Sequence, residues 1–432
     1  MFVSPCLDVN DQGHLTIGGC DTVELAQQFG TPLYVMDESE IRRACASYRE
    51  SIERYYDGKG LVAYASKAFS CKAICRVILE EGLGLDVVSG GELYTALSAG
   101  FPPEKLFFHG NNKTPQELRE ALECGVGYIV VDNVFELELL GELASSQGKT
   151  ANILLRIKPG VDAHTHQFIR TGQIDSKFGF ALETGEAMAA VERALSLTGI
   201  HLKGLHCHIG SQIFDREPFE AAAEIMIGFL ADIHDRWGRE LEVLNLGGGF
   251  GIKYLSDHNP IPYDKYMEGI SRVVKQACAQ RGIATPLIVM EPGRSIVGAA
   301  GITLYTVGGV KEIPGIRTYV SVDGGMTDNP RYILYQSEYE ALIANRADQP
   351  KDTVVTVAGR CCESGDLIGE GMPLQRTQPG DLMAVLSTGA YNYSMASNYN
   401  RVPRPAVVLV WNGTPRLVIR RECYEDLVRN DL

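Results

Sequence analysis

The sequence has no long hydrophobic run, little positive charge and no low-complexity tract. No apolar run approaches the roughly 18 residues that span a bilayer, so we expect no membrane protein. Its 40 basic and 54 acidic residues give a net charge of −14, which is a poor match for nucleic acid or an anionic membrane surface. Residues 1–14 lack the basic start and apolar stretch of a signal peptide. Because eleven scattered cysteines fit reduced thiols better than disulfides, we expect a globular cytoplasmic protein.

Short apolar runs alternate with helix-like segments along residues 36–296. The strand-like runs are Leu61–Ser66, Gly84–Ser89, Lys105–His109, Tyr128–Asp132, Ala151–Ile157, Lys203–Ile209, Glu242–Leu246 and Pro286–Glu291. Segments with helical periodicity include Gln116–Glu123, Phe135–Ala144, Gly185–Leu197, Pro218–Trp237 and Tyr263–Gln280. Eight strand-like runs that alternate with helices predict an α/β fold of the (β/α)8, TIM-type barrel class.

The pattern changes at about residue 297, where strand-like runs begin to follow one another closely. These runs are Thr303–Lys311, Arg317–Asp323, Thr353–Ala358, Asp381–Leu386, Ala406–Val410 and Arg416–Arg420. They predict a mainly antiparallel C-terminal β-domain. An extra strand, Pro32–Asp37, precedes the barrel and is expected to pair with that domain. We therefore expect a barrel at 36–296 and a discontinuous β-domain formed by 1–35 and 297–432.

A lysine and two glycine-containing turns follow predicted barrel strands, at the ends where barrel enzymes place their chemistry. Lys67 follows the first strand, either as a solvated surface lysine or as an amine that bonds to an aldehyde cofactor or a carbonyl substrate. Residues 247–251, Gly-Gly-Gly-Phe-Gly, follow the seventh strand and let backbone N–H groups approach a phosphate. The eighth strand ends in Glu291-Pro292-Gly293-Arg294. Together these features predict pyridoxal phosphate, with Glu291 keeping its pyridine nitrogen protonated.

Two histidines on the sixth predicted strand, His206 and His208, allow a competing interpretation. The two-residue period of a strand places them on the same side. They suit a zinc hydrolase, to which His164 and His166 would add imidazoles. Against this, the glycine turn and the Glu-Pro-Gly-Arg turn are expected to offer no ligands, and no aspartate ends the eighth strand. We predict no metal, with His208 stacking on the cofactor, Ser211 donating to its phosphate and His206 as a hydrogen-bonded core histidine.

The motifs occur together, in this order, in a known family. The chain resembles the diaminopimelate decarboxylases, pyridoxal-phosphate enzymes of the alanine-racemase-like fold group, over nearly its whole length. The resemblance is carried by Tyr-Ala-Ser-Lys-Ala at 64–68, Leu-Asp-Val-Val-Ser-Gly-Gly-Glu-Leu at 85–93, His-Cys-His-Ile-Gly-Ser-Gln at 206–212, the glycine turn, Glu-Pro-Gly-Arg, Cys-Glu-Ser-Gly-Asp at 362–366 and Gly-Ala-Tyr at 389–391. It implies cofactor contacts by Lys67, Asp86, His208, Ser211, Gly248, Gly249, Glu291, Gly293, Arg294 and Tyr391.

The resemblance also implies a reaction and a set of catalytic residues. The reaction is decarboxylation of meso-2,6-diaminopimelate to L-lysine and carbon dioxide, the last step of lysine biosynthesis. Lys67, His208 and Cys362 are the implied catalytic residues, with the Cys362 thiol as proton donor and Cys361 as an ordinary buried thiol. The implied substrate contacts are Arg294, Arg331, Tyr335, Glu363 and Tyr391. The family is homodimeric, with Cys362 and Glu363 expected to enter the partner subunit's site.

Two features separate this chain from relatives with the same cofactor. Racemases of this fold place an arginine at the pyridine nitrogen, and Glu291 argues against that activity. Ornithine decarboxylases follow Ile-Leu-Tyr with an aspartate for a distal ammonium, whereas here Gln336 follows and Arg331 stands upstream. An arginine fork suits a carboxylate, although Arg331 fits a solvated surface arginine equally well. A non-catalytic pyridoxal-phosphate carrier and a metal-dependent barrel hydrolase stay open as alternatives.

Overall fold

The computed structural model describes residues 2–161 and 176–432, and the chain folds into two units. The unit that we call the barrel unit consists of Ala44–Gly251 and Pro260–Gly293. The β unit consists of Met1–Arg43, Ile252–Asn259 and Arg294–Leu432. The domain limits expected at residues 36 and 296 stay a prediction. The segment Ile252–Asn259 also belongs to the β unit, and no feature of the sequence predicted this.

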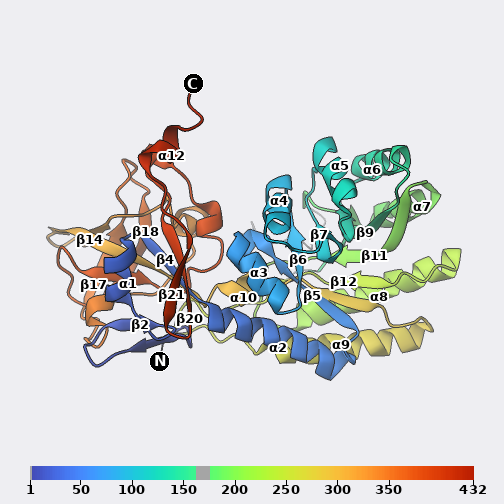
Figure 1. Ribbon diagram of the computed structural model, residues 1–432. Coiled ribbons are helices and arrows are strands. Elements are labelled where there is room, and N and C mark those ends of the chain that lie inside the picture. Colours follow the sequence, from blue (N-terminus) through green and yellow to red (C-terminus); the bar gives the residue numbers. More distant parts are fainter. Residues whose placement is uncertain (1, 162–175) are drawn as a thin grey trace. The chain divides into compact units, whose positions relative to one another are not determined.

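In the barrel unit, eight of the described strands run parallel and close into a ring (Figure 1). Their order is β9-β11-β12-β13-β5-β6-β7-β8, and the pairing of β8 with β9 completes the ring. The strands are β5 (Gly60–Ala65), β6 (Gly84–Val87), β7 (Leu106–Phe108), β8 (Tyr128–Val131), β9 (Ala151–Lys158), β11 (Ile200–Cys207), β12 (Val243–Asn245) and β13 (Leu287–Met290). A two-residue strand, β10 (Phe180–Ala181), also pairs with β9. The predicted fold class, a TIM-type barrel with a β-domain, is confirmed.

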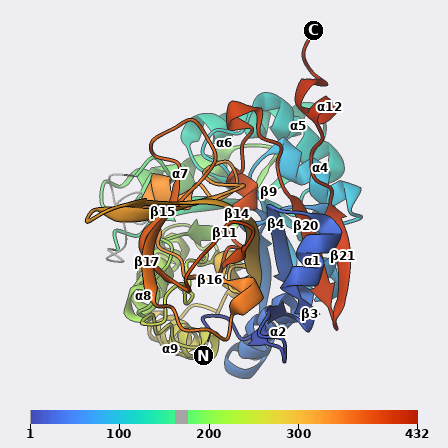
Figure 2. The ribbon, with the colours of Figure 1, turned by 90° about the vertical axis from the view of Figure 1, so that its left-hand side faces the viewer.

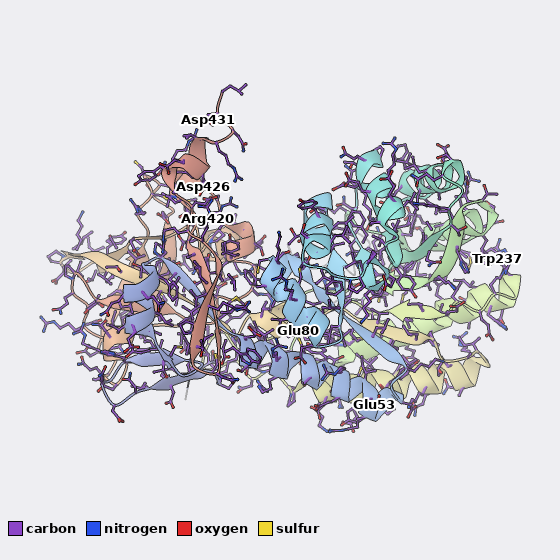
Figure 3. The ribbon with its side chains drawn as sticks, viewed as in Figure 1. Glu53, Glu80, Trp237, Arg420, Asp426 and Asp431 are labelled. Atoms are coloured by element: carbon purple, nitrogen blue, oxygen red, sulfur yellow. The ribbon has the colours of Figure 1, made fainter. Side chains whose placement is uncertain are left out.

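Helices alternate with the barrel strands. They are α2 (Glu38–Tyr56), α3 (Lys72–Glu80), α4 (Gly90–Ser98), α5 (Pro115–Cys124), α6 (Val134–Ser146), α7 (Glu186–Ser196), α8 (Glu217–Trp237) and α9 (Tyr263–Arg281). Helix α5 begins with a reciprocal capping box between Thr114 and Glu117 and ends at left-handed Gly125. Charged side chains such as Glu53 and Glu80 are exposed on the outer faces (Figure 3). No helix of the described ranges is both long enough and apolar enough to cross a bilayer.

Apolar side chains from successive strands fill the barrel interior. The buried cluster contains Ala63, Phe107, Val130, Leu154, Val243 and Val289. Because the interior is packed, ligands cannot pass through it, and a site must be built from side chains at the strand ends.

The β unit is built on one large mixed sheet (Figure 2). Its strands are β4 (Leu33–Asp37), β14 (Gly301–Ile313), β15 (Arg317–Val322), β16 (Ala341–Ile343), β17 (Thr353–Ala358), β18 (Leu367–Leu374), β19 (Leu382–Val385), β20 (Ala406–Trp411) and β21 (Thr414–Ile419). Strand β4 pairs antiparallel with β14 and parallel with β20, so the predicted pairing of Pro32–Asp37 with the second domain is confirmed. The unit also contains a small sheet of β1 (Leu7–Val9), β2 (Leu15–Ile17) and β3 (Cys20–Asp21) and, among its helices, α1 (Thr22–Phe29) and α12 (Tyr424–Val428).

A buried ion pair fixes the loop that follows β7. The Lys113 ammonium donates to the carbonyl oxygens of Gly110 and Val130, at 2.8 and 2.7 Å, and to Glu136 Oε1 at 2.8 Å. The two charged side chains are 1% and 3% exposed. Burial lowers the pKa of Lys113 and raises that of Glu136, and each opposite charge acts against that shift. The pair thereby ties the loop to β8 and α6.

Replacing Glu136 with leucine should lower the free energy of unfolding of the barrel unit by on the order of 3–5 kcal/mol, because Lys113 keeps a buried charge without its partner. The double variant Lys113→Met/Glu136→Leu should regain most of that loss, since no charge then stays buried. Urea unfolding followed by circular dichroism measures both. Glu138→Leu, which removes an exposed pair with Arg193, is the matched control and should change stability by less than about 1 kcal/mol. A Glu136→Leu variant as stable as this control would contradict the prediction.

Candidate active site

Lys67 lies directly after β5, in the short 3-10 helix Ser66–Ala68. Its side chain is exposed, whereas the neighbouring residues Ser66 and Ala68 are buried. The backbone is therefore held in place while the Lys67 amine is accessible to solvent. Lys113, also near a strand end, directs its ammonium to two carbonyl oxygens and to Glu136. Those three contacts use all three of its donor protons. Of these two lysines, Lys67 is the one with an amine that can react with a ligand.

The glycine turn after β12 packs so closely on its neighbours that no side chain fits. A Cβ on Gly248 would lie 2.0 Å from the carbonyl oxygen of Glu291. A Cβ on Gly249, whose φ is +117°, would lie 2.3 Å from the carbonyl oxygen of Gly210. The loops after β11, β12 and β13 therefore meet through their backbones. A cradle of backbone groups at this place fits the phosphate of a cofactor such as pyridoxal phosphate.

Glu291, directly after β13, is buried and accepts hydrogen bonds from three side chains. His109 Nε2 and Asn245 Nδ2 lie 2.7 and 2.6 Å from Oε1, and His206 Nε2 lies 3.2 Å from Oε2. Burial acts to raise the pKa of Glu291, but the two histidines outweigh it and hold that pKa well below its usual range. Glu291 is thus an ionised carboxylate at neutral pH. The prediction of His206 as a hydrogen-bonded core histidine is confirmed.

Asp86 and His208 belong to the same end of the barrel. Asp86 Oδ1, in β6, lies 3.8 Å from His109 Nε2. Burial raises the pKa of Asp86 to about 6, although the charges of His109 and Lys67 act to lower it. His208 Nδ1 accepts a hydrogen bond of 3.3 Å from the Gly248 N–H. Loss of solvation, with the charge of Lys67, holds the pKa of His208 well below its usual range, so its ring is neutral at pH 7 and suited to stacking.

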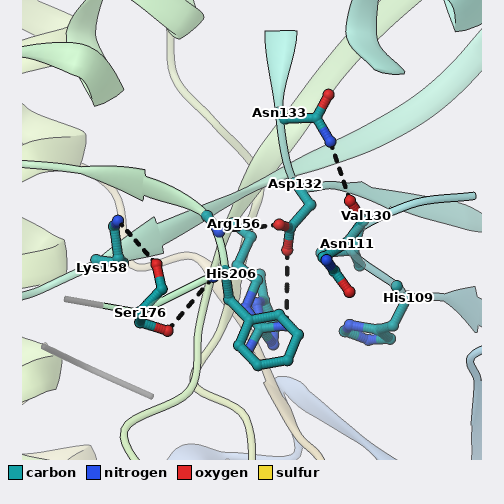
Figure 4. A network of polar contacts seen from close by, with 12 residues as sticks. His109, Asn111, Val130, Asp132, Asn133, Arg156, Lys158, Ser176 and His206 are labelled. Carbon is teal, nitrogen blue, oxygen red and sulfur yellow. Dashed lines mark hydrogen bonds and ion pairs between the residues drawn. The ribbon is translucent and has the colours of Figure 1, made fainter. Parts of the chain in front are cut away.

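Asp132, directly after β8, and Arg156, in β9, form a further pair of polar side chains (Figure 4). Arg156 Nη1 lies 3.7 Å from Asp132 Oδ1, and the Gly179 N–H donates to Asp132 Oδ2 at 3.0 Å. Neither residue was predicted to be functional. His164 and His166, which the metal interpretation used, lie outside the described residues.

His109, His206 and Glu291 also place three potential metal-ligand atoms within 4.8 Å of one another. The expectation that the Glu-Pro-Gly-Arg turn offers no ligand is therefore wrong, because Glu291 faces two imidazoles. Hydrogen bonds of 2.7 and 3.2 Å already connect these three side chains. That the site works without a metal stays a prediction.

In the β unit, Arg294 lies against Tyr391. Arg294 begins the short helix α10 (Arg294–Val297) and is buried. Its Nη1 donates to the Tyr254 hydroxyl at 2.6 Å. The centre of its guanidinium lies 4.7 Å from the centroid of the Tyr391 ring, which is a cation–π distance. Tyr391 itself has a φ of +69°, a left-handed backbone conformation that few residues other than glycine adopt.

A second arginine, Arg331, lies against the same Tyr391 ring. Arg331 begins helix α11 (Arg331–Tyr335), and its guanidinium lies 5.2 Å from the Tyr391 centroid and 5.1 Å from that of Tyr335. Its Nε donates to the Tyr339 hydroxyl at 2.9 Å. The interpretation of Arg331 as a solvated surface arginine is wrong, because the residue is only 8% exposed. Two buried guanidiniums on one aromatic ring form a cationic group suited to an anion.

Cys362 and Glu363 lie in an exposed turn after β17. Asp366 accepts a hydrogen bond of 2.7 Å from the Cys361 N–H, and the Cys362 N–H donates to Asn400 Oδ1 at 2.8 Å. Burial, with Asp366, raises the pKa of Cys361 to about 11, so that thiol stays protonated. The exposed thiol of Cys362 is the more accessible of the two.

The predicted site residues thus fall into two groups, one in each unit. The barrel unit holds Lys67, Asp86, His208, Ser211, Gly248, Gly249, Glu291 and Gly293, and the β unit holds Arg294, Arg331, Tyr335, Cys362, Glu363 and Tyr391. The roles assigned to these residues stay predictions. His109 and Asn245 were missed. His109 closes the predicted strand Lys105–His109, so the strand-end criterion that selected Lys67 could have found it, whereas Asn245 gives no such signal.

The class of protein is indicated by four features together: the parallel barrel, the exposed amine of Lys67, the glycine turn and the ionised carboxylate of Glu291. Residues 38–298 match the family model described as pyridoxal-dependent decarboxylase, pyridoxal binding domain. The chain therefore belongs to the pyridoxal-phosphate-dependent decarboxylases, and pyridoxal phosphate is its cofactor.

Within that class, the similar proteins of known name point to one enzyme family. The chain is 53% identical to a diaminopimelate decarboxylase of Bacillus subtilis, with 100% of this chain and 98% of that protein covered. It is 47% identical to one of Synechocystis, with 98% and 91% covered. A solved diaminopimelate decarboxylase of M. jannaschii in complex with L-lysine has a TM-score of 0.92 and 37% identity, with 100% and 99% covered. The chain belongs to the diaminopimelate decarboxylases.

Borohydride reduction of the protein with bound cofactor should fix the cofactor to Lys67 and abolish the long-wavelength absorbance band. The physical reason is the exposed amine of Lys67 at a strand end beside the glycine cradle. Peptide mapping by mass spectrometry locates the adduct. Lys72, which is exposed on the adjoining helix, and buried Lys113 are internal controls. An adduct on either control lysine would show that the assignment of Lys67 is wrong.

Proposed function

We propose that this protein removes one carboxyl group from meso-2,6-diaminopimelate to give L-lysine and carbon dioxide, the last step of lysine biosynthesis. The observation that carries the proposal is Glu291, an ionised carboxylate held by His109, Asn245 and His206 among the barrel strand ends. When bound, pyridoxal phosphate supplies the electron sink that a decarboxylation needs. A carboxylate beside the ring nitrogen favours the protonated form, which withdraws electrons strongly, whereas an arginine at that place would disfavour it.

Each of the barrel residues has a task that follows from its surroundings. Lys67 would hold the cofactor through its amine. Gly248 and Gly249 bind the phosphate through backbone N–H groups, with Ser211 as a further donor. The neutral ring of His208 would stack on the cofactor ring. Glu291 would keep the ring nitrogen protonated.

The β-unit residues account for the choice of substrate. Arg294 and Arg331 are buried cations that share the ring of Tyr391, and their planar forks can bind the distal carboxylate of diaminopimelate bidentately. Ornithine and lysine lack that carboxylate. Glu363 is exposed and can accept from the distal ammonium of the substrate. The solved relative in complex with L-lysine binds the expected product of this reaction.

We also propose a homodimer in which Cys362 and Glu363 act in the partner subunit's site. The exposed turn that carries both residues supports this assignment. The Cys362 thiol would donate a proton to the substrate α-carbon after carbon dioxide leaves. A cytoplasmic location is consistent with the eleven cysteines, all of which are free thiols.

Carbon dioxide release from a panel of amino acids tests the proposed function. The panel contains the three stereoisomers of diaminopimelate, L-lysine and L-ornithine. We expect release from the meso isomer with L-lysine as product. Cofactor binding without release from any of them would favour the carrier interpretation. Metal analysis beside an absorbance spectrum tests the hydrolase alternative.

Replacing Arg331 with alanine should reduce kcat/KM for diaminopimelate by about 10- to 150-fold, because a charge-assisted contact with a carboxylate contributes roughly 1.5–3 kcal/mol. Arg331→Lys keeps the charge but not the fork and should recover only part of that loss. The matched control is Arg317→Ala, which removes an exposed arginine paired with Glu370. Turnover of lysine and ornithine should stay low in every variant. Unchanged kinetics of Arg331→Ala with diaminopimelate would show that Arg331 does not bind the substrate.

Mixing inactive Lys67→Ala and Cys362→Ala dimers should restore about a quarter of wild-type activity if sites are shared. With free subunit exchange, about half of the dimers are mixed, and each mixed dimer has one site with both lesions and one with neither. Differently tagged subunits verify the exchange, and lysine formation is the measurement. If mixed dimers form and activity stays at the level of the mutants, Cys362 does not act across the interface.

A further inference from the structure

We propose that His109 and Asn245 are positioning residues that aim the Glu291 carboxylate at the ring nitrogen of the cofactor. The proposal rests on the proposed function, because it takes the Glu291 carboxylate as the partner of that nitrogen. Both residues contact Glu291 through their side chains. They act through Glu291, and their effect should be visible in the properties of the bound cofactor.

The hydrogen bonds of Glu291 leave room for one further donor. An ionised carboxylate only accepts hydrogen bonds and offers about four lone-pair positions. His109 and Asn245 both donate to Oε1, at 2.7 and 2.6 Å, and His206 donates to Oε2 at 3.2 Å. Oε1 is therefore saturated, while Oε2 keeps one position. Fixed donors on three sides determine the direction in which that last position points.

The orientation of the Asn245 amide follows from its other hydrogen bond. The Gly247 N–H donates to Asn245 Oδ1 at 2.9 Å, so the oxygen of the amide faces the glycine turn and Nδ2 faces Glu291. The Glu291 N–H in turn donates to the Gly247 carbonyl at 2.8 Å. Asn245 thus connects the predicted phosphate turn to the predicted ring-nitrogen partner. One amide sets the relative positions of the two groups that hold opposite sides of the cofactor.

The His109 side chain is fixed by its ring and by its backbone. Its N–H donates to the Val87 carbonyl at 2.8 Å, and the next carbonyl, of Gly110, accepts from the buried Lys113 ammonium at 2.8 Å. Its ring lies edge-on to that of His206, with centroids 4.8 Å apart. The loop after β7 therefore holds the imidazole against Glu291 without help from a ligand. The ion pair of Lys113 belongs to this support.

Three substitutions separate positioning from packing. Asn245→Asp has the same shape and can still accept from Gly247, but it cannot donate to Glu291 and adds a like charge beside it. His109→Leu removes the donor, and His109→Gln restores an N–H at a similar place. Asn152→Asp is the matched control, because Asn152 lies near the start of β9 in the same unit, at the other end of the parallel strands from Glu291. Thermal melting of the cofactor-free proteins shows which variants fold.

The main measurement compares two cofactors, pyridoxal phosphate and the analogue in which a C–H replaces the ring nitrogen. Wild type should bind the natural cofactor about 10- to 100-fold more tightly than this analogue, since only the former makes the charge-assisted contact with Glu291. Asn245→Asp and His109→Leu should lose most of this preference through weaker binding of the natural cofactor. Affinity for the analogue should change less than twofold in His109→Leu. His109→Gln and Asn152→Asp should keep the preference.

A second readout is the nitrogen NMR shift of cofactor labelled at the ring nitrogen. Wild type should show a protonated ring nitrogen at pH 8, and Asn245→Asp and His109→Leu should move the signal toward the unprotonated form. Folded variants that keep the wild-type preference and signal would overturn the positioning roles. If His109→Leu does not fold, Asn245→Asp alone decides. A wild type that decarboxylates diaminopimelate but binds both cofactors equally would overturn the inference and leave the proposed function standing.

Discussion

The pairing of β8 with β9 closes the barrel, and this closure brings residues distant in the sequence to one ring of strand ends. Parallel strands all end on the same side, so each contributes its last side chains to the same region. Lys67 follows β5, His109 follows β7, Asn245 ends β12 and Glu291 follows β13. A barrel interior filled by apolar residues keeps these polar groups at the rim. A single barrel closure therefore brings the Lys67 amine, the glycine turn and the Glu291 carboxylate to the same end of the barrel.

The charges at this rim are arranged so that two neighbouring carboxyl groups titrate differently. Burial raises the pKa of Asp86 to about 6, whereas His109 and His206 overcome burial and hold the pKa of Glu291 well below its usual range. Both carboxyl groups face His109, at 3.8 and 2.7 Å, and the shorter contact goes to the residue that stays ionised. The difference matters because the proposed chemistry needs a permanent negative charge at only one of the two positions.

Strand ends could be predicted from the sequence because apolar runs and glycine turns are local signals. Lys67, Glu291 and the glycine turn followed from that reading, and the fold class with them. Strands β16 and β18 could not be predicted from the sequence. Strand β16 is short, and β18 contains Gly369, Gly371 and Pro373, which disfavour a strand assignment. Asn245 was missed for another reason: its role depends on Glu291, a neighbour 46 positions away that only the folded barrel reveals. The burial of Arg331 likewise depends on Tyr339 and Tyr391, which no helical or strand period identifies.

Two of the points at which the chain passes between its two units lie in the glycine turn and in the Glu-Pro-Gly-Arg turn. It leaves the barrel unit after Gly251, at the end of the glycine turn, and again after Gly293, within Glu-Pro-Gly-Arg. In the β unit, the first of these crossings is fixed by Tyr254, whose hydroxyl accepts from Arg294, the first residue after the second crossing. Gly293, which is proposed to contact the cofactor, is thus followed directly by Arg294, which is proposed to bind the substrate. A Cβ at Gly248 or Gly249 would meet the carbonyl oxygen of Glu291 or Gly210, so a side chain at either position would displace the backbone of a neighbouring turn.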